Sequence, residues 1–171
     1  MTVVIGFNWP VEHDHSVAVV VDGELVFASE EERWTRHKHS IDEPPINALV
    51  QALKFLKSKY GLSPSDVDAY AVNYEPRLYR RVDRAYWLRH VIINGVKYGY
   101  YDGGELGLAI DYLRSRVNLD NYLKYAYYLI RYSIRKAGFD APINIKVIPV
   151  EHHLAHAASA YYFSGFGNAW Y

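Results

Sequence analysis

The sequence predicts an α/β domain built on one mixed, five-stranded sheet, and two observations lead to this class. Short β-branched runs alternate with longer segments of helical apolar spacing, a pattern typical of strands and helices that pack in layers. The predicted order is three strands, a helix, a strand, a helical insertion, a strand and a last helix. With 171 residues, of which 50% are hydrophobic and 22% charged, the chain can bury a core.

The first three strands have the clearest signals. Residues 2–7 are an apolar, β-branched run typical of a buried strand. Residues 15–30 predict two strands joined at Asp22-Gly23, a dipeptide favoured in tight hairpin turns. Three antiparallel strands are therefore expected at the start of the chain.

A helix and two further strands complete the predicted sheet. Apolar residues at helical spacing over 46–57 predict a helix, and Gly61 suits its end. Residues 66–74 read as a strand parallel to the first, because a helix joins the two. The tyrosine-rich range 75–140 is interpreted as a helical insertion, and 143–150 as the fifth strand.

The segment VEHHLAHAASAYYF, residues 150–163, holds three of the eight histidines. In a helix, His152 and His156 lie one turn apart on the same face, so both imidazoles can reach one metal ion. Neutral imidazole suits iron or zinc, usually with a further carboxylate ligand. His153 points elsewhere by about 100° and is expected to have a supporting or structural role. On spacing alone, an exposed helix face that carries histidines by chance is the stronger interpretation.

Two segments resemble one protein family. HDHSVAVVVDGELVFASEEERWTRHKH, residues 13–39, resembles the opening of the nodulation- and antibiotic-type O-carbamoyltransferases. EHHLAHAASAYYFSGF, residues 151–166, resembles the second signature of that family. The sequence departs from the family pattern at His15, where serine is usual, and at Gly165, where proline is usual.

The resemblance implies the half-domain of the actin-like ATPase (ribonuclease-H-like) and sugar-kinase superfamily. Residues 1–171 are then a single N-terminal half-domain, and the second half-domain and the adenylating domain are absent. The chain is expected to be cut near the start of another strand, since SGFGNAWY leads into a new apolar segment. Alone, it is expected to be inactive.

The resemblance also implies a reaction. Carbamoyl phosphate and ATP yield carbamoyl adenylate, whose carbamoyl group passes to a hydroxyl or amine acceptor beside a divalent metal, iron or zinc. His152 and His156 match the metal ligands of the family. The loop with His13 and Asp14 faces the nucleotide, where His13 either donates to an oxygen or acts as general base. The alternative is that Asp14 caps a turn and His13 is a solvated loop residue.

A dense charged run follows the third strand. Its members are Glu31, Glu32, Arg33, Arg36, Lys38 and His39. The resemblance favours Arg36 and Lys38 as the residues that bind the anionic carbamoyl adenylate. Arg33 is expected to brace the loop against Glu31 or Glu32. The alternative is a solvated loop with weak local ion pairs.

Composition limits the partners. Lysine plus arginine equals aspartate plus glutamate, so no global field favours nucleic acid or an anionic membrane. No apolar run approaches a membrane span, no signal segment is present and cysteine is absent, so a cytoplasmic protein is expected. The expected partners are a small hydroxyl acceptor, carbamoyl phosphate and the missing C-terminal domains.

Three other functions fit parts of the sequence. The related tRNA threonylcarbamoyl-transfer proteins share the histidine pair, but they usually carry a glutamate between the histidines, where this chain has HLA. A sugar kinase is disfavoured because no glycine-rich phosphate signature follows the first strand. A non-catalytic half-domain that acts as a scaffold would expose an apolar face and form homo-oligomers.

Overall fold

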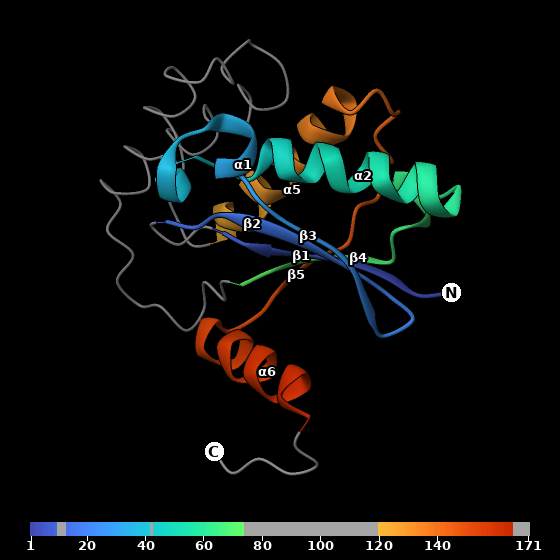
Figure 1. Ribbon diagram of the computed structural model, residues 1–171. Helices are drawn as coiled ribbons and strands as arrows, with labels where there is room; N and C mark the ends of the chain where they lie inside the picture. The colour runs from blue at the N-terminus through green and yellow to red at the C-terminus, as the bar shows by residue number, and fades with distance from the viewer. Residues whose placement is uncertain (10–12, 42, 74–119, 166–171) are drawn as a thin grey trace.

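The described chain folds around a mixed sheet of five strands (Figure 1). The computed structural model describes residues 1–9, 13–41, 43–73 and 120–165. The strands are β1 (Val3–Asn8), β2 (Ser16–Val21), β3 (Glu24–Glu30), β4 (Ala69–Val72) and β5 (Val147–Pro149). Their order is β3-β2-β1-β4-β5, with β1 antiparallel to β2 and parallel to β4, and β5 parallel to β4. The predicted α/β class and mixed sheet are confirmed.

The hairpin between β2 and β3 forms where the sequence predicts it. Asp22 and Gly23 both have positive φ, 49° and 87°. Two left-handed residues match the right-handed twist of the flanking strands, so the turn closes without splaying them. Side chains then alternate across the sheet, and in β1 the residues Val3, Ile5 and Phe7 all face the core.

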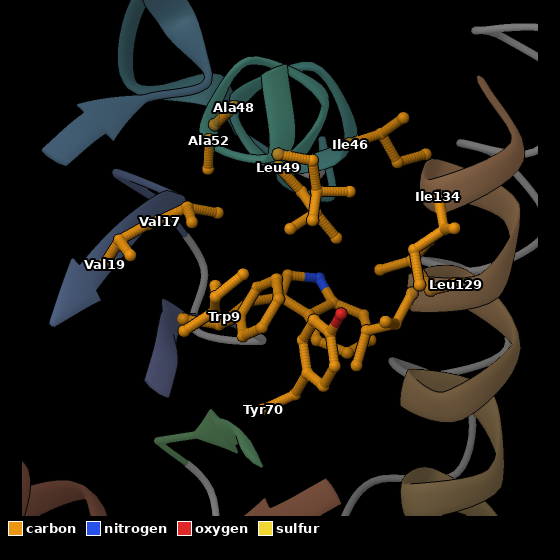
Figure 2. Close-up of a cluster of buried hydrophobic side chains, with 14 of the residues drawn as sticks. Trp9, Val17, Val19, Ile46, Ala48, Leu49, Ala52, Tyr70, Leu129 and Ile134 are labelled. Carbon is orange, nitrogen blue, oxygen red and sulfur yellow. The ribbon is translucent and has the colours of Figure 1, made fainter. Parts of the chain in front are cut away.

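Two long helices cover one face of the sheet. The predicted helix is α2 (Ile46–Tyr60), and it ends at Gly61, whose φ is 72°. The second is α5 (Asp120–Lys136), which buries Leu129 and Ile134 against α2 and the sheet. Figure 2 shows this core, in which Trp9 and Tyr70 lie between the strands and the two helices.

The end of the predicted helical insertion belongs to this core. The insertion was expected over 75–140, and residues 74–119 lie outside the described residues. The remainder contains α5, which connects the parallel strands β4 and β5 and is therefore an integral crossover helix rather than surface decoration.

The last strand is shorter than expected. Residues 143–150 were predicted as a strand, whereas β5 spans three residues. Its partner β4 has only four residues and pairs with β5 from Tyr70 to Val72, and the Tyr70 N–H still donates to the Lys146 carbonyl at 2.9 Å. Residues 143–145 therefore have no partner from β4. Ile143 is accordingly 84% exposed.

The histidine segment forms α6 (His152–Ser164) on the opposite side of the sheet from α2 and α5 (Figure 1). None of its residues is buried, and Tyr162 and Phe163 are largely exposed. Smaller elements are α1 (Glu32–Thr35) and the 3-10 turns η1 (Lys38–Ser40) and η2 (Pro64–Asp66). Among the described residues, no helix has the length and apolar character needed to cross a bilayer.

Candidate functional site

The two predicted metal ligands lie together on the first turn of α6. The Nε2 atoms of His152 and His156 are hydrogen-bonded to each other at 3.0 Å, and their ring planes are nearly perpendicular at 88°. Glu151 caps this turn because its carboxylate accepts a hydrogen bond from the backbone N–H of Leu154 at 2.7 Å. The expectation that the two imidazoles share one face of a helix is confirmed.

His153 points away from this pair. Its Nδ1 lies 2.9 Å from the Glu151 carboxylate, and its side chain is 84% exposed. Hydrogen bonds from Leu154 and His153 lower the pKa of Glu151 to about 2, so the cap is an anion at neutral pH. His153 therefore supports the helix start and does not converge on the histidine pair.

A second group of polar residues forms around Asp14. His13 Nδ1 lies 2.7 Å from one carboxylate oxygen of Asp14, and His39 Nδ1 lies 2.9 Å from the other. These contacts hold the pKa of Asp14 below its ordinary value, and the hydrogen bond with His39 has a larger effect than that with His13. The three residues and Ile41 line a pocket of about 290 Å³.

Backbone bonds join the two loops that supply this group. The Asp14 N–H donates to the His39 carbonyl at 2.6 Å, and the His15 N–H donates to Ser40 Oγ at 3.0 Å. Asp14, His39 and Ser40 all have positive φ, which non-glycine residues seldom adopt outside functional or tightly constrained sites. The loops expected to flank the nucleotide thus lie side by side.

The predicted anion-binding residues lie on the second loop. Arg36 ends α1 in the left-handed conformation with φ 62°, and Lys38 begins η1. Both side chains are exposed. They are therefore accessible to a ligand.

The charged run is not uniformly solvated, which corrects one alternative given above. Glu31 is fully buried, and its carboxylate accepts hydrogen bonds from the backbone N–H groups of Asn47 and Ala48 at 3.1 and 2.7 Å. Burial raises the pKa of Glu31. Arg33 pairs with Glu30 at 3.6 Å, not with Glu31 or Glu32 as expected.

Two asparagines that the sequence analysis did not select connect the two groups. Asn8 donates through Nδ2 to the Asp14 carbonyl at 2.8 Å, and its Oδ1 accepts from Asn73 Nδ2 at 2.6 Å. Asn73 Nδ2 also lies 3.4 Å from His152 Nδ1, and Asn73 Oδ1 accepts from the Trp9 N–H at 2.9 Å. Their positions at the ends of parallel strands were the available sequence signal.

A further pocket separates the sheet from α6. It has a volume of about 430 Å³. Small residues of the strands, such as Gly6 and Ala18, line it together with Asn8, Asn73 and His156. The space therefore exists because the face of the sheet turned toward α6 carries small side chains. Its lining is largely apolar, and a few polar side chains such as Asn8 and Asn73 add hydrogen-bonding groups.

One group of ligand atoms could be bridged by a cation. Oxygen or nitrogen atoms of Asp14, Glu32 and His39 lie within 4.8 Å of one another. However, Glu32 already accepts a hydrogen bond from the His39 backbone N–H at 2.7 Å, and His39 contacts Asp14. These contacts explain the cluster without an ion.

Fold and site together define an α/β protein whose polar residues gather at the carboxyl ends of the parallel strands β1, β4 and β5, where open α/β sheets usually bind ligands. The chain belongs to the carbamoyltransferase N-terminus family, whose family model matches residues 4–169. The family expected from the two sequence signatures is thereby confirmed.

Individual relatives agree with this assignment. Nodulation protein U of Rhizobium tropici is 34% identical over 61 residues, which cover 36% of this chain and 10% of that protein. The uncharacterized protein sll1178 of Synechocystis is 30% identical over 171 residues, which cover 99% of this chain and 24% of that protein. The chain therefore spans a quarter or less of the length of these curated relatives.

Proposed function

We propose that this chain is the N-terminal part of a carbamoyltransferase that transfers a carbamoyl group from carbamoyl adenylate to a hydroxyl acceptor at a metal site. Family membership supports carbamoyl transfer as the general reaction. The proposal assigns formation of carbamoyl adenylate, from carbamoyl phosphate and ATP, to a separate adenylating domain. It also takes the sheet order β3-β2-β1-β4-β5 as that of an actin-like ATPase half-domain.

The observation that carries the metal site is the spacing of the histidine pair. Two nitrogens that each lie about 2.1 Å from one ion are separated by about 3.0 Å at the right angle of octahedral coordination and by about 3.4 Å at the tetrahedral angle of zinc. The Nε2 atoms of His152 and His156 have the shorter of these separations. The pair is therefore close enough to become two adjacent ligands of iron, and of zinc after a small opening, once the hydrogen bond between the two rings is replaced by the ion. A bound divalent ion would polarise the carbamoyl carbonyl or order the acceptor oxygen.

His13 is proposed as the general base for the acceptor hydroxyl. A carboxylate can only accept hydrogen bonds, so the contact with Asp14 assigns the proton of His13 to Nδ1. The opposite ring nitrogen, Nε2, is then a base on an exposed side chain beside the 290 Å³ pocket. Asp14 orients the ring rather than exchanging protons with the substrate.

Arg36 and Lys38 are proposed to bind the anionic part of carbamoyl adenylate. Both are exposed on the loop that is hydrogen-bonded to Asp14, so they can approach a ligand in the same pocket. The acceptor is proposed to occupy the 430 Å³ pocket beside His156, where amide and hydroxyl groups can bind a hydroxylated molecule. Its reactive hydroxyl is placed toward Asn8, which lines this pocket and is hydrogen-bonded to the Asp14 carbonyl next to His13.

The test is a titration of this chain with Fe(II) and Zn(II), combined with elemental analysis. Wild-type protein is compared with His152→Ala and His156→Ala, and we expect each variant to lose at least about 10-fold in affinity, since removal of one ligand leaves a single imidazole. His153→Ala is the matched control, because His153 is on the same turn but faces Glu151.

Two results would contradict the metal site. One is unchanged metal affinity in both variants, and the other is an equal loss in His153→Ala. Absence of binding in the wild-type chain would require the same titration on the longest natural form of the protein. If that protein also bound no metal, the pair would be structural and the proposed mechanism would be wrong.

A further inference from the structure

Asp14 is shared by two imidazoles. His13 Nδ1 and His39 Nδ1 contact different oxygens of the carboxylate, at 2.7 and 2.9 Å. Because the carboxylate has no proton to donate, both rings must carry a proton on Nδ1. Both rings therefore have the same tautomer when neutral. If one ring loses its hydrogen bond to Asp14, the carboxylate that the other ring contacts is also altered.

His39 is fixed more firmly than His13. Its backbone N–H donates to Glu32 Oε2 at 2.7 Å, and its carbonyl accepts from the Asp14 N–H at 2.6 Å. Its φ of 62° is uncommon among non-glycine residues, and these bonds stabilise that conformation. His39 thus connects Glu32 to Asp14, while His13 contacts Asp14 from an exposed loop position.

We propose that His39 is a positioning residue for His13, which acts through the shared Asp14 carboxylate to fix the tautomer and direction of the His13 ring. The proposal rests on the proposed function insofar as it treats His13 as the base. The contact between the three side chains does not depend on any reaction. It assigns a purpose to a histidine that the sequence analysis placed only in the charged run.

The electrostatics of the carboxylate agree with this geometry. The pKa of Asp14 is lowered, and the hydrogen bond with His39 is the largest cause, ahead of that with His13. An ionised Asp14 accepts from both rings, whereas a protonated one would keep only one oxygen free to accept. His39 therefore helps to preserve the acceptor that His13 requires.

The experiment is NMR on this chain in the presence of EDTA. The ¹³C signal of the Asp14 carboxyl is titrated with pH, and ¹⁵N shifts report which nitrogen of His13 carries the proton. In His39→Ala we expect the Asp14 midpoint to rise and His13 to shift toward the tautomer with the proton on Nε2. His153→Ala is the control, because it removes a histidine–carboxylate contact of the same length elsewhere.

His39→Asn separates positioning from folding. Asparagine tolerates positive φ, and its Nδ2 can donate from nearly the place of the histidine Nδ1. We expect this variant to restore both the Asp14 midpoint and the His13 tautomer. Wild-type values in His39→Ala, or equal changes in His39→Ala and His39→Asn, would overturn the proposal.

A kinetic comparison gives a second readout in a form of the protein that performs carbamoyl transfer. His39→Ala should lower kcat about 10-fold with little change in KM, against about 100-fold or more for His13→Ala, since a positioned base contributes about 10²–10⁴-fold. If no carbamoyl transfer is found, the proposed function fails, and the NMR result still decides whether His39 positions His13.

Discussion

Single residues at the ends of the parallel strands connect the two histidine groups, and Asn73 is the central one. Replacing Asn73 by alanine should lower the free energy of unfolding by about 1–3 kcal/mol, because the Trp9 N–H loses its acceptor in a part-buried position. The same change removes a donor to His152 Nδ1. A neutral His152 that binds Zn(II) through Nε2 carries its proton on Nδ1 and cannot accept from Asn73, so affinity for Zn(II) should not fall and should rise by about 2- to 5-fold. Urea denaturation and metal titration measure the two effects.

Asn144→Ala is the matched control for this change, because Asn144 is exposed and lies in the segment before β5. It should leave both stability and metal affinity within error. A Zn(II) affinity of Asn73→Ala equal to wild type would mean that the 3.4 Å contact does not oppose Zn(II) binding at His152.

Lys38 provides a test of the proposed anion site. Lys38→Ala should weaken binding of AMP, which carries the phosphate of carbamoyl adenylate, about 5- to 10-fold at low salt, with a smaller difference at high salt, because an exposed charge is screened. Changes in amide NMR shifts of residues 13–15 and 36–41 during titration measure the affinity. Lys136→Ala, at the exposed end of α5, should bind as wild type, and equal losses would indicate non-specific attraction.

The sequence could predict the histidine pair but not its surroundings. His152 and His156 are related by a local rule, since residues four apart share a helix face. The contacts of Asn73 with Asn8 and His152 span 65 and 79 residues of sequence, and that of His39 with Asp14 spans 25. Such long-range contacts depend on which strands are neighbours in the sheet and on positive φ at non-glycine residues. Neither feature can be predicted from the local sequence pattern.

At the scale of elements, the N-terminus of α2 depends on the buried carboxylate of Glu31. Three donors point at it, two backbone N–H groups and Asn47 Nδ2, the last at 2.6 Å. Glu31→Gln turns one acceptor oxygen into an NH₂ group that faces donors. We expect a loss of about 1–3 kcal/mol in unfolding free energy at neutral pH, measured by urea denaturation. Glu24→Gln makes the same chemical change at the exposed start of β3 and serves as the control.

The pH dependence of this carboxylate has a definite sign. Because burial raises the pKa of Glu31 in the folded state, the folded protein binds the proton more tightly than the unfolded chain. The contribution of Glu31 to stability should therefore be greatest below the ordinary glutamate pKa and should decrease as pH rises through the folded value. The contribution is measured as the difference in unfolding free energy between wild type and Glu31→Gln, followed from below the ordinary glutamate pKa to neutral pH. A difference that grows with pH would contradict the assignment.

The elements themselves were predictable where local signals agree with the tertiary structure. The Asp22-Gly23 turn and the α2 helix ending at Gly61 formed as expected, since turn and cap residues act locally. The place of α5 in the core was not predicted, because the tyrosine-rich range 75–140 was interpreted only as a helical insertion. Its buried stripe, which includes Leu129 and Ile134, becomes meaningful only once the crossover between β4 and β5 is known.

At the scale of the whole molecule, the two faces of the sheet are packed very differently. Leu53 of α2 is 1% exposed within the core, whereas Phe163 of α6 is 69% exposed. Leu53→Ala should therefore cost about 2–5 kcal/mol of unfolding free energy, and Phe163→Ala should change it by no more than about 0.5 kcal/mol. Urea denaturation of both variants at one protein concentration measures the contrast.

The contrast decides how the histidine pair is held in place. If α6 adds little to global stability, the positions of His152 and His156 depend on few links to the sheet, such as the Asn73 contact and the hydrogen bond from the Val150 N–H to the Val72 carbonyl at 2.8 Å. Hydrogen exchange of α6 amides should then be faster than that of α2 amides, and Zn(II) should slow it by tying the helix start to one ion. A cost for Phe163→Ala close to that of Leu53→Ala would show instead that α6 is packed in solution, and packing rather than a shared ion would then fix the pair.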